Sequence, residues 1–252
     1  MTTRRFFSPA MLPLLLATWT WAPTAAGAQE ALNPAQKQAF EALVRDYILQ
    51  NPEIILESLS LMEARQKVEK EQAIRAALVS QRAALERDSG DPVVGNPDGD
   101  VTIVEFFDYQ CTYCKSVMGP LMELVARDGN IRLVLKEFPI LGPASEVAAR
   151  ASLAAARQGK YEAFHLDLMR LRGRLTEAAI YQVAREVGLD LAILRADMAD
   201  PAIQAQIQKA YRLAQVLQIQ GTPAFAIGDR LIPGAINQKQ MAELVAEARQ
   251  GG

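Results

Sequence analysis

The stretch VEFFDYQCTYCK, residues 104–115, decides the fold that this sequence predicts. Its first half closes an apolar run from Val101 to Phe107, which is rich in β-forming residues and is typical of a buried central strand. The residues from Thr112 to Arg127 then follow with helical spacing, and Pro120 should kink that helix because its ring removes a backbone donor. The pattern therefore places Cys111 between the end of a buried strand and the N-terminus of a helix.

Cys111 and Cys114, the two cysteines of the chain, are candidates for a redox-active disulfide. Unpaired backbone N–H groups and the helix dipole favour a thiolate at a helix N-terminus, and only the thiolate attacks a disulfide. The spacing places Cys114 one helical turn along, so it can resolve a mixed disulfide formed by Cys111. We expect Cys111 to be the nucleophile and Cys114 the resolving thiol.

Three other roles for the two cysteines compete with this one. A zinc site needs four ligands, and the chain offers only His165 besides the two thiols, so no metal is expected there. A purely structural disulfide that closes so short a loop would constrain the unfolded chain little. A copper(I) site stays open, because soft thiolates suit that ion. His165 lies in a helical stretch and is expected to be packed rather than catalytic.

Glu105 precedes Cys111 by six residues inside the apolar run. A buried carboxylate without a partner is costly, and acids of this kind are typical of active sites. We expect Glu105 to relay a proton to Cys114, the alternative being an acid at a strand edge that faces solvent. Lys136 on the next predicted strand could pair with Glu105 or be solvated.

A second motif, GTPAF at residues 221–225, precedes a short predicted strand. A proline in this position is a candidate for a cis peptide bond. A loop of this kind that faces the two thiols would leave the backbone of Thr222 free to hold an extended substrate. Thr222 and Pro223 are therefore candidate substrate-binding residues, together with Thr112 and Tyr113 between the cysteines.

The rest of the second half predicts an α/β fold. Strands are expected at residues 131–136, 224–227 and 230–232, helices through residues 146–216, and a last helix at residues 237–249. The order β-α-β, helices, β-β-α is the thioredoxin order with a helical insertion. We therefore expect a thioredoxin-like catalytic domain at residues 101–252.

The N-terminal residues 1–28 have the pattern of a secretory signal peptide. Arg4 and Arg5 precede an apolar stretch of about twelve residues, which is too short to span a membrane. Ala26-Gly27-Ala28 supplies a small-residue cleavage site, so Gln29 should be the first mature residue. The two arginines also resemble a twin-arginine signal, but we expect ordinary secretion.

Residues 29–88 predict an all-helical arm, followed by a linker at residues 89–100 that is rich in glycine and proline. Asn33-Pro34 and Asn51-Pro52 are typical helix starts. The second helix opens with apolar residues nearly all round, which a lone exposed helix cannot sustain. The charged stretch at residues 63–72 argues against docking on the same chain's catalytic domain. We expect residues 31–87 to form a homo-oligomer.

Charge and composition exclude other classes. The formal net charge is -2 and no basic block stands out, so no nucleic-acid partner is expected. Half of the residues are hydrophobic, which is ample for one core.

Residues 104–115 and Gly221-Thr222-Pro223 together resemble the active-site segment and the cis-proline loop of the DsbA-like family of periplasmic disulfide oxidoreductases. The resemblance covers residues 94–250. It implies that Cys111 is the nucleophile, Cys114 the resolving thiol and Glu105 the buried acid, with no cofactor. The implied partners are exported proteins that contain cysteine and a DsbD-like or DsbB-like membrane protein that resets the thiols. The implied location is the periplasm.

The arm, at residues 40–61, resembles the N-terminal domain of the suppressor of copper sensitivity C (ScsC) proteins, in which the arm can oligomerise the protein. The dipeptide between the cysteines is Thr-Tyr, where DsbA has Pro-His. Oxidase, isomerase and reductase roles therefore all stay open. Two further alternatives are a copper(I)-binding protein without catalytic turnover and an interaction protein that acts through its arm.

Overall fold

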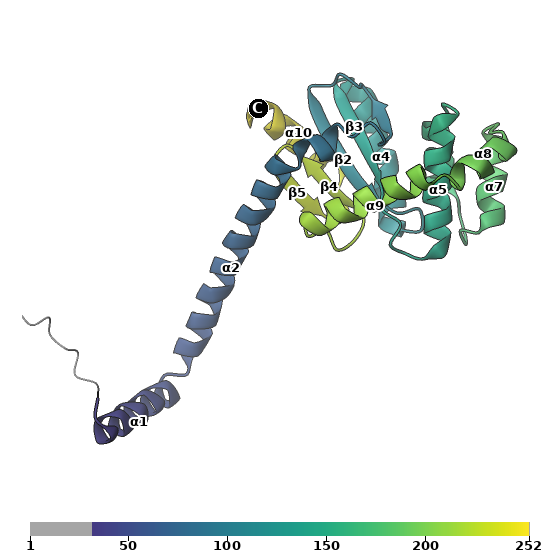
Figure 1. Cartoon of the computed structure of the whole chain (residues 1–252). Helices are drawn as coiled ribbons and strands as arrows, with labels where there is room; N and C mark the ends of the chain where they lie inside the picture. The colour runs from purple at the N-terminus through teal and green to yellow at the C-terminus, as the bar shows by residue number, and fades with distance from the viewer. Residues whose placement is uncertain (1–31, 252) are drawn as a thin grey trace, which may run out of the picture. The chain divides into compact units, whose positions relative to one another are not determined.

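A computed structural model describes residues 32–251 of the chain (Figure 1). The expected signal peptide at residues 1–28 lies outside the described residues. Backbone contacts divide the chain into two compact units, with the boundary between Ser60 and Leu61.

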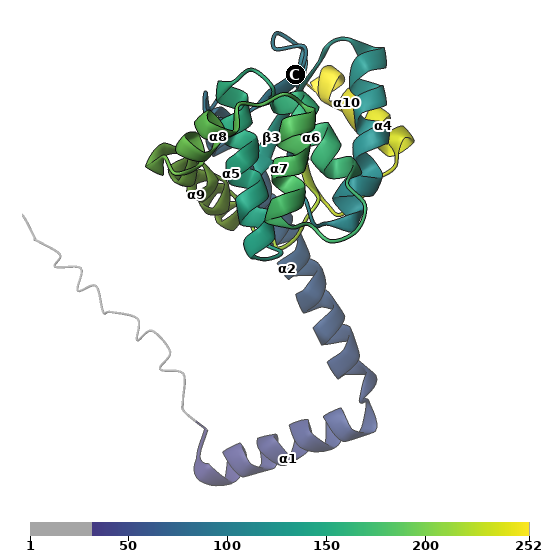
Figure 2. The same ribbon diagram turned by 90° about the vertical axis from the view of Figure 1, so that its right-hand side faces the viewer.

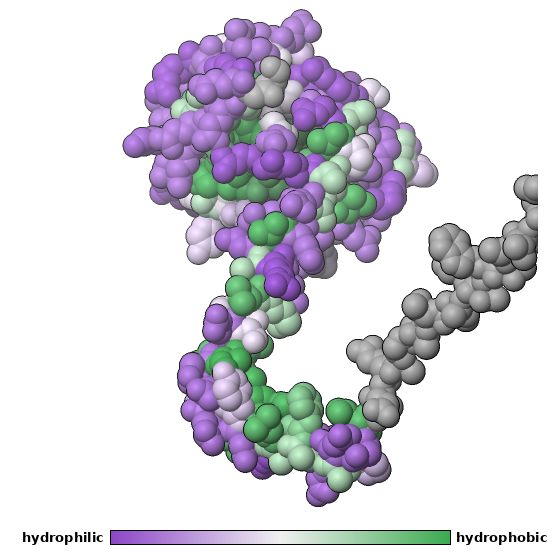
Figure 3. All heavy atoms as spheres, turned by 90° about the vertical axis from the view of Figure 1, so that its left-hand side faces the viewer, coloured by the Kyte–Doolittle hydropathy of each residue, from purple (hydrophilic) through white to green (hydrophobic). Residues whose placement is uncertain are grey.

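The first unit contains helix α1 (Pro34–Gln50) and the first turns of helix α2 (Glu53–Ser80). The predicted start at Asn33 is confirmed, because its Oδ1 accepts a hydrogen bond of 2.9 Å from the backbone N–H of Gln36. The Gln36 side chain accepts one of 3.0 Å from the backbone of Asn33, which completes a capping box. Figure 3 shows apolar side chains gathered along α1 and the first part of α2.

The second unit is built on a five-stranded mixed sheet with the order β1-β3-β2-β4-β5 (Figure 1). Strands β2 and β3 run parallel, and the other neighbouring pairs run antiparallel. The predicted thioredoxin-like fold is thereby confirmed. The strands are β1 (Val93–Gly95), β2 (Val101–Phe107), β3 (Ile131–Glu137), β4 (Ala224–Ile227) and β5 (Arg230–Pro233).

The helical insertion lies between β3 and β4. Figure 2 shows its helices α5 to α8 beside one another. The predicted breaks at glycines and at Pro201 are confirmed as helix ends. The helices are α4 (Thr112–Asp128), α5 (Pro143–Arg157), α6 (Tyr161–Arg170), α7 (Glu177–Glu186), α8 (Leu191–Met198), α9 (Pro201–Val216) and α10 (Gln238–Gly251).

Each face of the sheet has its own core. Ile103 and Phe107 of β2 pack in the larger core, with α4, α10 and the helical insertion. Phe106 of β2 faces the other way and packs with Leu78 of α2 and Leu85 of α3 (Arg82–Glu86). The arm's end therefore packs on the sheet of the same chain, contrary to the expectation from its charged stretch, because apolar residues resume at Ile74. The proposed domain division at residue 88 stays a proposal.

Strand β1 lies within residues 89–100, which we expected to be a linker of turns. It has only three residues and is flanked by turn-forming residues, so no periodicity reveals it. Asp91, just before β1, forms a buried ion pair with Lys136 of β3, and the carbonyl of Ala84 accepts a second hydrogen bond from Lys136. Neither expectation for Lys136, a pair with Glu105 or a solvated side chain, is met. Successive side chains of a strand face opposite ways, and Lys136 lies beside Phe106 on the other face of the sheet from Glu105.

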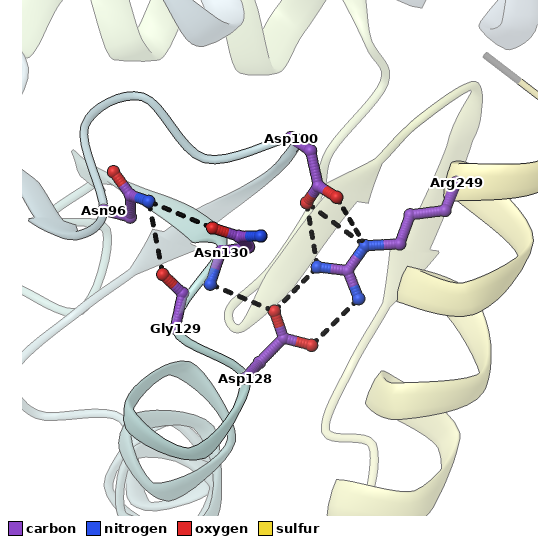
Figure 4. Close-up of polar contacts among 6 residues, drawn as sticks. All are labelled: Asn96, Asp100, Asp128, Gly129, Asn130 and Arg249. Carbon is purple, nitrogen blue, oxygen red and sulfur yellow. Dashed lines mark hydrogen bonds and ion pairs between the residues drawn. The ribbon is translucent and has the colours of Figure 1, made fainter.

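Arg249 ties the C-terminal helix α10 to the residue before β2 and to the last residue of α4 (Figure 4). Its Nη2 lies 2.8 Å from Oδ1 of Asp100, just before β2, and 2.7 Å from Oδ1 of Asp128, the last residue of α4. Beside it, Nδ2 of Asn96 donates to the carbonyl of Gly129 at 3.2 Å. These contacts hold together the end of the domain away from the cysteines. Within residues 32–251, no helix has the length and apolar character needed to cross a membrane.

Candidate active site

Cys111 is the N-cap residue of α4, with an extended backbone, and its Sγ accepts a hydrogen bond of 3.3 Å from the backbone N–H of Cys114. Both cysteines are free thiols. Cys111 keeps 6% of its surface exposed, whereas Cys114 keeps none. A partner sulfur can therefore approach Cys111 first.

The surroundings of Cys111 stabilise its thiolate. The hydrogen bond from the Cys114 thiol, followed by contacts with Thr222 and the backbone N–H groups of Cys114 and Tyr113, outweighs burial and lowers the pKa of Cys111 to about 5. The pKa of Cys114 is raised, first by its hydrogen bond to Cys111, then by burial and by the nearby Glu105. At neutral pH one sulfur is thus charged and the other is not.

The turn that presents Cys111 is held by Asp108, which the sequence analysis did not single out. Its Oδ1 accepts hydrogen bonds of 2.7 Å from the backbone of Gln110 and from Oγ of Ser145, and its Oδ2 accepts one of 2.9 Å from the backbone of Leu141. Its carbonyl accepts the backbone N–H of Cys111 at 3.0 Å. An Asp between a strand and a helix is a common turn signal and could have identified it.

The structure brings Thr222 to Cys111, as the second motif predicted. Cys111 Sγ lies 3.2 Å from the carbonyl oxygen of Thr222, across 111 residues of sequence. The Thr222–Pro223 peptide bond is cis, which confirms that prediction. The Pro223 carbonyl accepts the backbone N–H of Gly234 at 2.8 Å, so the loop is tied to the end of β5.

Glu105 is buried, with 2% of its surface exposed, and its Oε1 has no hydrogen-bond partner among the described residues. It lies on the same face of β2 as Ile103 and Phe107, toward the core that contains Cys114. Burial, and secondarily the Cys111 thiolate, raise the pKa of Glu105 to about 8. Its carboxyl group therefore holds a proton at neutral pH.

Thr112 and Tyr113 are exposed on the first turn of α4, and 66% of Tyr113 is open to solvent. No hydrogen bond joins either side chain to the Thr222–Pro223 loop in the part of the chain that the structure describes. Their binding role stays a prediction.

His165 is buried, as expected, and takes part in a network beneath the site. The Tyr109 hydroxyl lies 3.0 Å from its Nδ1, and Tyr109 and Tyr161 both donate to Oε1 of Glu137, at 3.0 and 2.8 Å. Burial lowers the pKa of His165 to about 3, so it is neutral. Among residues 32–251, no three His, Cys, Asp or Glu side chains are grouped so as to hold a metal ion.

Comparison with known proteins finds two family models. Residues 102–246 match the model of the DSBA-like thioredoxin domain, and residues 36–69 match that of the copper resistance protein ScsC N-terminal domain. A thioredoxin-like oxidoreductase from Silicibacter pomeroyi is 49% identical, with a TM-score of 0.67, over 68% of this chain and 99% of its own. ScsC of Proteus mirabilis, in a transitional conformation, is 31% identical, with a TM-score of 0.65, over 88% of this chain and 99% of its own.

Among curated proteins, the thiol:disulfide interchange protein DsbA of Bordetella parapertussis is 28% identical over 58% of this chain and 71% of its own length. Further curated matches include Na+/H+ antiporters. The one from Salinispora arenicola is 31% identical over 64% of this chain, and the aligned part spans only 25% of that protein.

Proposed function

We propose, because the chain belongs to the family of DSBA-like thioredoxin domains, that it is a periplasmic thiol–disulfide oxidoreductase that forms or isomerises disulfide bonds in exported proteins. One observation carries the proposal. The thiol of Cys111 caps α4 with a pKa of about 5, and its sulfur lies 3.2 Å from the carbonyl of the cis-proline loop. A charged nucleophile thus lies beside a backbone segment that can hold an extended substrate.

In the proposed reaction, the Cys111 thiolate attacks a disulfide of the client. A bond forms between Cys111 and one client sulfur, the client's own S–S bond breaks, and the released client sulfur takes up a proton. Cys114 then attacks Cys111, which forms the Cys111–Cys114 disulfide and releases the second client thiol. In the reverse direction the protein oxidises a client dithiol. If the first released client sulfur instead attacks another disulfide of the client, the sulfur that this attack frees can displace Cys111 from the mixed disulfide, which rearranges the client's disulfides and restores the Cys111 thiolate.

Cys114 must lose a proton to resolve the mixed disulfide, although its surroundings raise its pKa. Glu105 is the proposed proton acceptor: with a pKa of about 8, a minor fraction of its buried carboxyl groups is ionised at neutral pH, and that carboxylate, which acts electrostatically on Cys114, can take up the proton. A membrane redox protein of the DsbD-like or DsbB-like kind is proposed to restore the starting redox state.

The test of this function is turnover of a protein with scrambled disulfides. Cys111→Ser should abolish all exchange, and Cys114→Ser should accumulate a covalent complex with the client that a reductant dissolves. Ser116→Ala, an exposed change on the same helix, is the matched control and should leave turnover unchanged. Undiminished turnover by Cys111→Ser would disprove the proposal.

We also propose that the arm joins several copies of the chain. Large apolar side chains on α1 and α2 are open to solvent, among them Phe40 at 57%, Leu43 at 68% and Leu56 at 69%. Exposed apolar surface of this kind marks an interaction site, and closed symmetry is the default for copies of one chain. The match of residues 36–69 to the ScsC N-terminal domain supports the same proposal.

Sedimentation of the mature protein tests the oligomer, and a monomer at tens of micromolar would refute it. Deleting residues 29–60 keeps Leu78 and Leu85, which cover the sheet, and should give a monomer that still oxidises simple dithiols. Loss of isomerase activity in that monomer would tie isomerisation to assembly. Equal isomerase activity in both forms would show that assembly does not affect the chemistry.

A copper(I)-binding role is the second candidate, since the family model that matches the arm is named for copper resistance. The thiolates of Cys111 and Cys114 would then bind the ion. Stoichiometric copper(I) binding that a chelator reverses, without turnover of a scrambled client, would favour this role over catalysis.

A further inference from the structure

A cavity of about 420 Å³ lies beside the cis-proline loop, within the second compact unit. One wall is α2, which contributes Lys70 and Ile74. The other walls are the loop itself and strand β5. The sequence does not predict a part for α2 in the redox site, but at this cavity the arm's end meets the substrate loop.

The wall formed by α2 is fixed to the domain. Arg75 Nε lies 3.4 Å from Oδ2 of Asp229, in the turn between β4 and β5. One turn further along α2, Leu78 is 98% buried against the sheet, and Ile74 packs on the same core as Ile219 and Leu231. The cavity therefore has a defined shape.

The lining of the cavity combines partly buried apolar side chains with exposed polar ones. Ile74, Ile219 and Leu231 supply the apolar side chains, and Lys70 and Gln220 are exposed. Of the polar residues in the lining, Lys70, Gln218 and Gln220 are exposed to solvent, so they offer a small polar ligand little that water does not. An apolar side chain on an extended chain fits it better.

We propose that this cavity is a specificity pocket that takes an apolar side chain of the client, close in sequence to the cysteine that reacts with Cys111. The inference rests on the proposed function. Thr222 lines the cavity and its carbonyl also contacts Cys111 Sγ, so one residue joins the pocket to the reacting sulfur. A client segment that is held along Thr222 while its sulfur meets Cys111 must pass the mouth of the pocket.

The pocket predicts that the rate at which a peptide thiol reduces the Cys111–Cys114 disulfide depends on the residues beside the peptide cysteine. Thiol chemistry alone predicts no such dependence on an apolar side chain. The full chain, with the Cys111–Cys114 disulfide formed, is mixed with peptides that carry one reduced cysteine. The peptide thiolate attacks Cys111, a peptide–Cys111 bond forms, the Cys111–Cys114 bond breaks, and Cys114 leaves with a proton. A second peptide thiol then releases a peptide disulfide. The rate of the first step is followed by acid quenching and mass spectrometry.

In the peptide series a single Leu replaces Ser at each of three positions on either side of the cysteine. At one position Leu should raise the rate about tenfold over the all-Ser peptide, as expected for burying one apolar side chain. Ile74→Trp, which fills the pocket, should reduce this preference to less than twofold, and Ile74→Ala should weaken it. Val68→Trp is the matched control on the same helix, where the side chain is exposed and does not line the pocket, and it should keep the preference.

The same proteins are also reduced with 2-mercaptoethanol, which has no side chain to place in the pocket. All of them should react within twofold of one another, which shows that each variant is folded and active. If no Leu position is preferred, or if Ile74→Trp keeps the preference, the pocket proposal is wrong although the redox function stands. If the small thiol does not reduce the wild-type disulfide, the proposed function itself fails.

Discussion

Replacing Glu105 by Gln should change how the stability of the reduced protein depends on pH. The folded protein holds the proton of Glu105 up to a pH of about 8, because the carboxyl group is buried without a partner, whereas an ordinary Glu releases it near pH 4.5. The folded state therefore binds more protons than the unfolded state between these two values. Stability linked to this proton is intact below pH 4.5 and is lost as the pH rises toward 8.

The size of the effect follows from the two pKa values. One pKa unit corresponds to about 1.36 kcal/mol, so ionisable Glu105 costs about 3 kcal/mol of folding stability at pH 7 and almost nothing at pH 4. Gln has nearly the same shape and does not ionise. The stability of Glu105→Gln relative to the wild type should therefore rise by about 3 kcal/mol between pH 4 and pH 7. Any constant cost of the buried amide cancels in this comparison.

Urea unfolding at pH 4 and pH 7, with a phosphine reductant present, measures the difference. Glu123→Gln, an exposed acid on α4, is the control and should show no such change. A stability difference between Glu105→Gln and the wild type that is the same at both pH values would refute the assignment of Glu105 as a buried acid. It would also remove the basis for proton transfer between Cys114 and Glu105.

Three other predictions concern different parts of the molecule. Alkylation of the reduced protein should modify Cys111 first, and the pH dependence of its rate should have a midpoint near pH 5. Faster labelling of Cys114 would contradict the assignment. Asp91→Asn should lower the free energy of unfolding by about 3 kcal/mol, because it leaves the buried Lys136 without its anion; a loss below about 0.5 kcal/mol in urea would show that the pair is dispensable. N-terminal sequencing of protein from its native host should begin at or near Gln29, and a chain that retains Arg4 and Arg5 would overturn the periplasmic location.

The sequence predicted the parts of the fold that local pattern controls. The apolar run that became β2, the cysteine at the start of α4 and the cis bond before β4 all lie within short segments with strong signals. Helix starts at Asn33 and the breaks at glycines were equally local. The burial of Glu105 was inferred correctly, because an acid in a continuous apolar run has few ways to reach water.

The parts that the sequence did not predict depend on contacts between distant segments. Strand β1 is defined by its pairing with β3 and has too few residues to show a period. Lys136 pairs with Asp91, 45 residues away, and register alone decides which face it occupies. Asp108 was passed over because its partners, Ser145 and Leu141, lie more than 30 residues downstream. The pocket walled by α2 has the same origin.

The packing of Leu78 and Leu85 on the sheet limits where recombination can divide a gene of this kind without disrupting the core. Recombination at residue 88, where the composition changes, would separate the sheet from two of the side chains that cover Phe106. A breakpoint near residue 60 falls between the two compact units and leaves that core whole. A chain that inherits the redox module by fusion should therefore carry the last turns of α2 with it, or supply other apolar residues in their place. The segment that is inherited as one folding unit would then begin near residue 60, some 28 residues before the change in composition at residue 88.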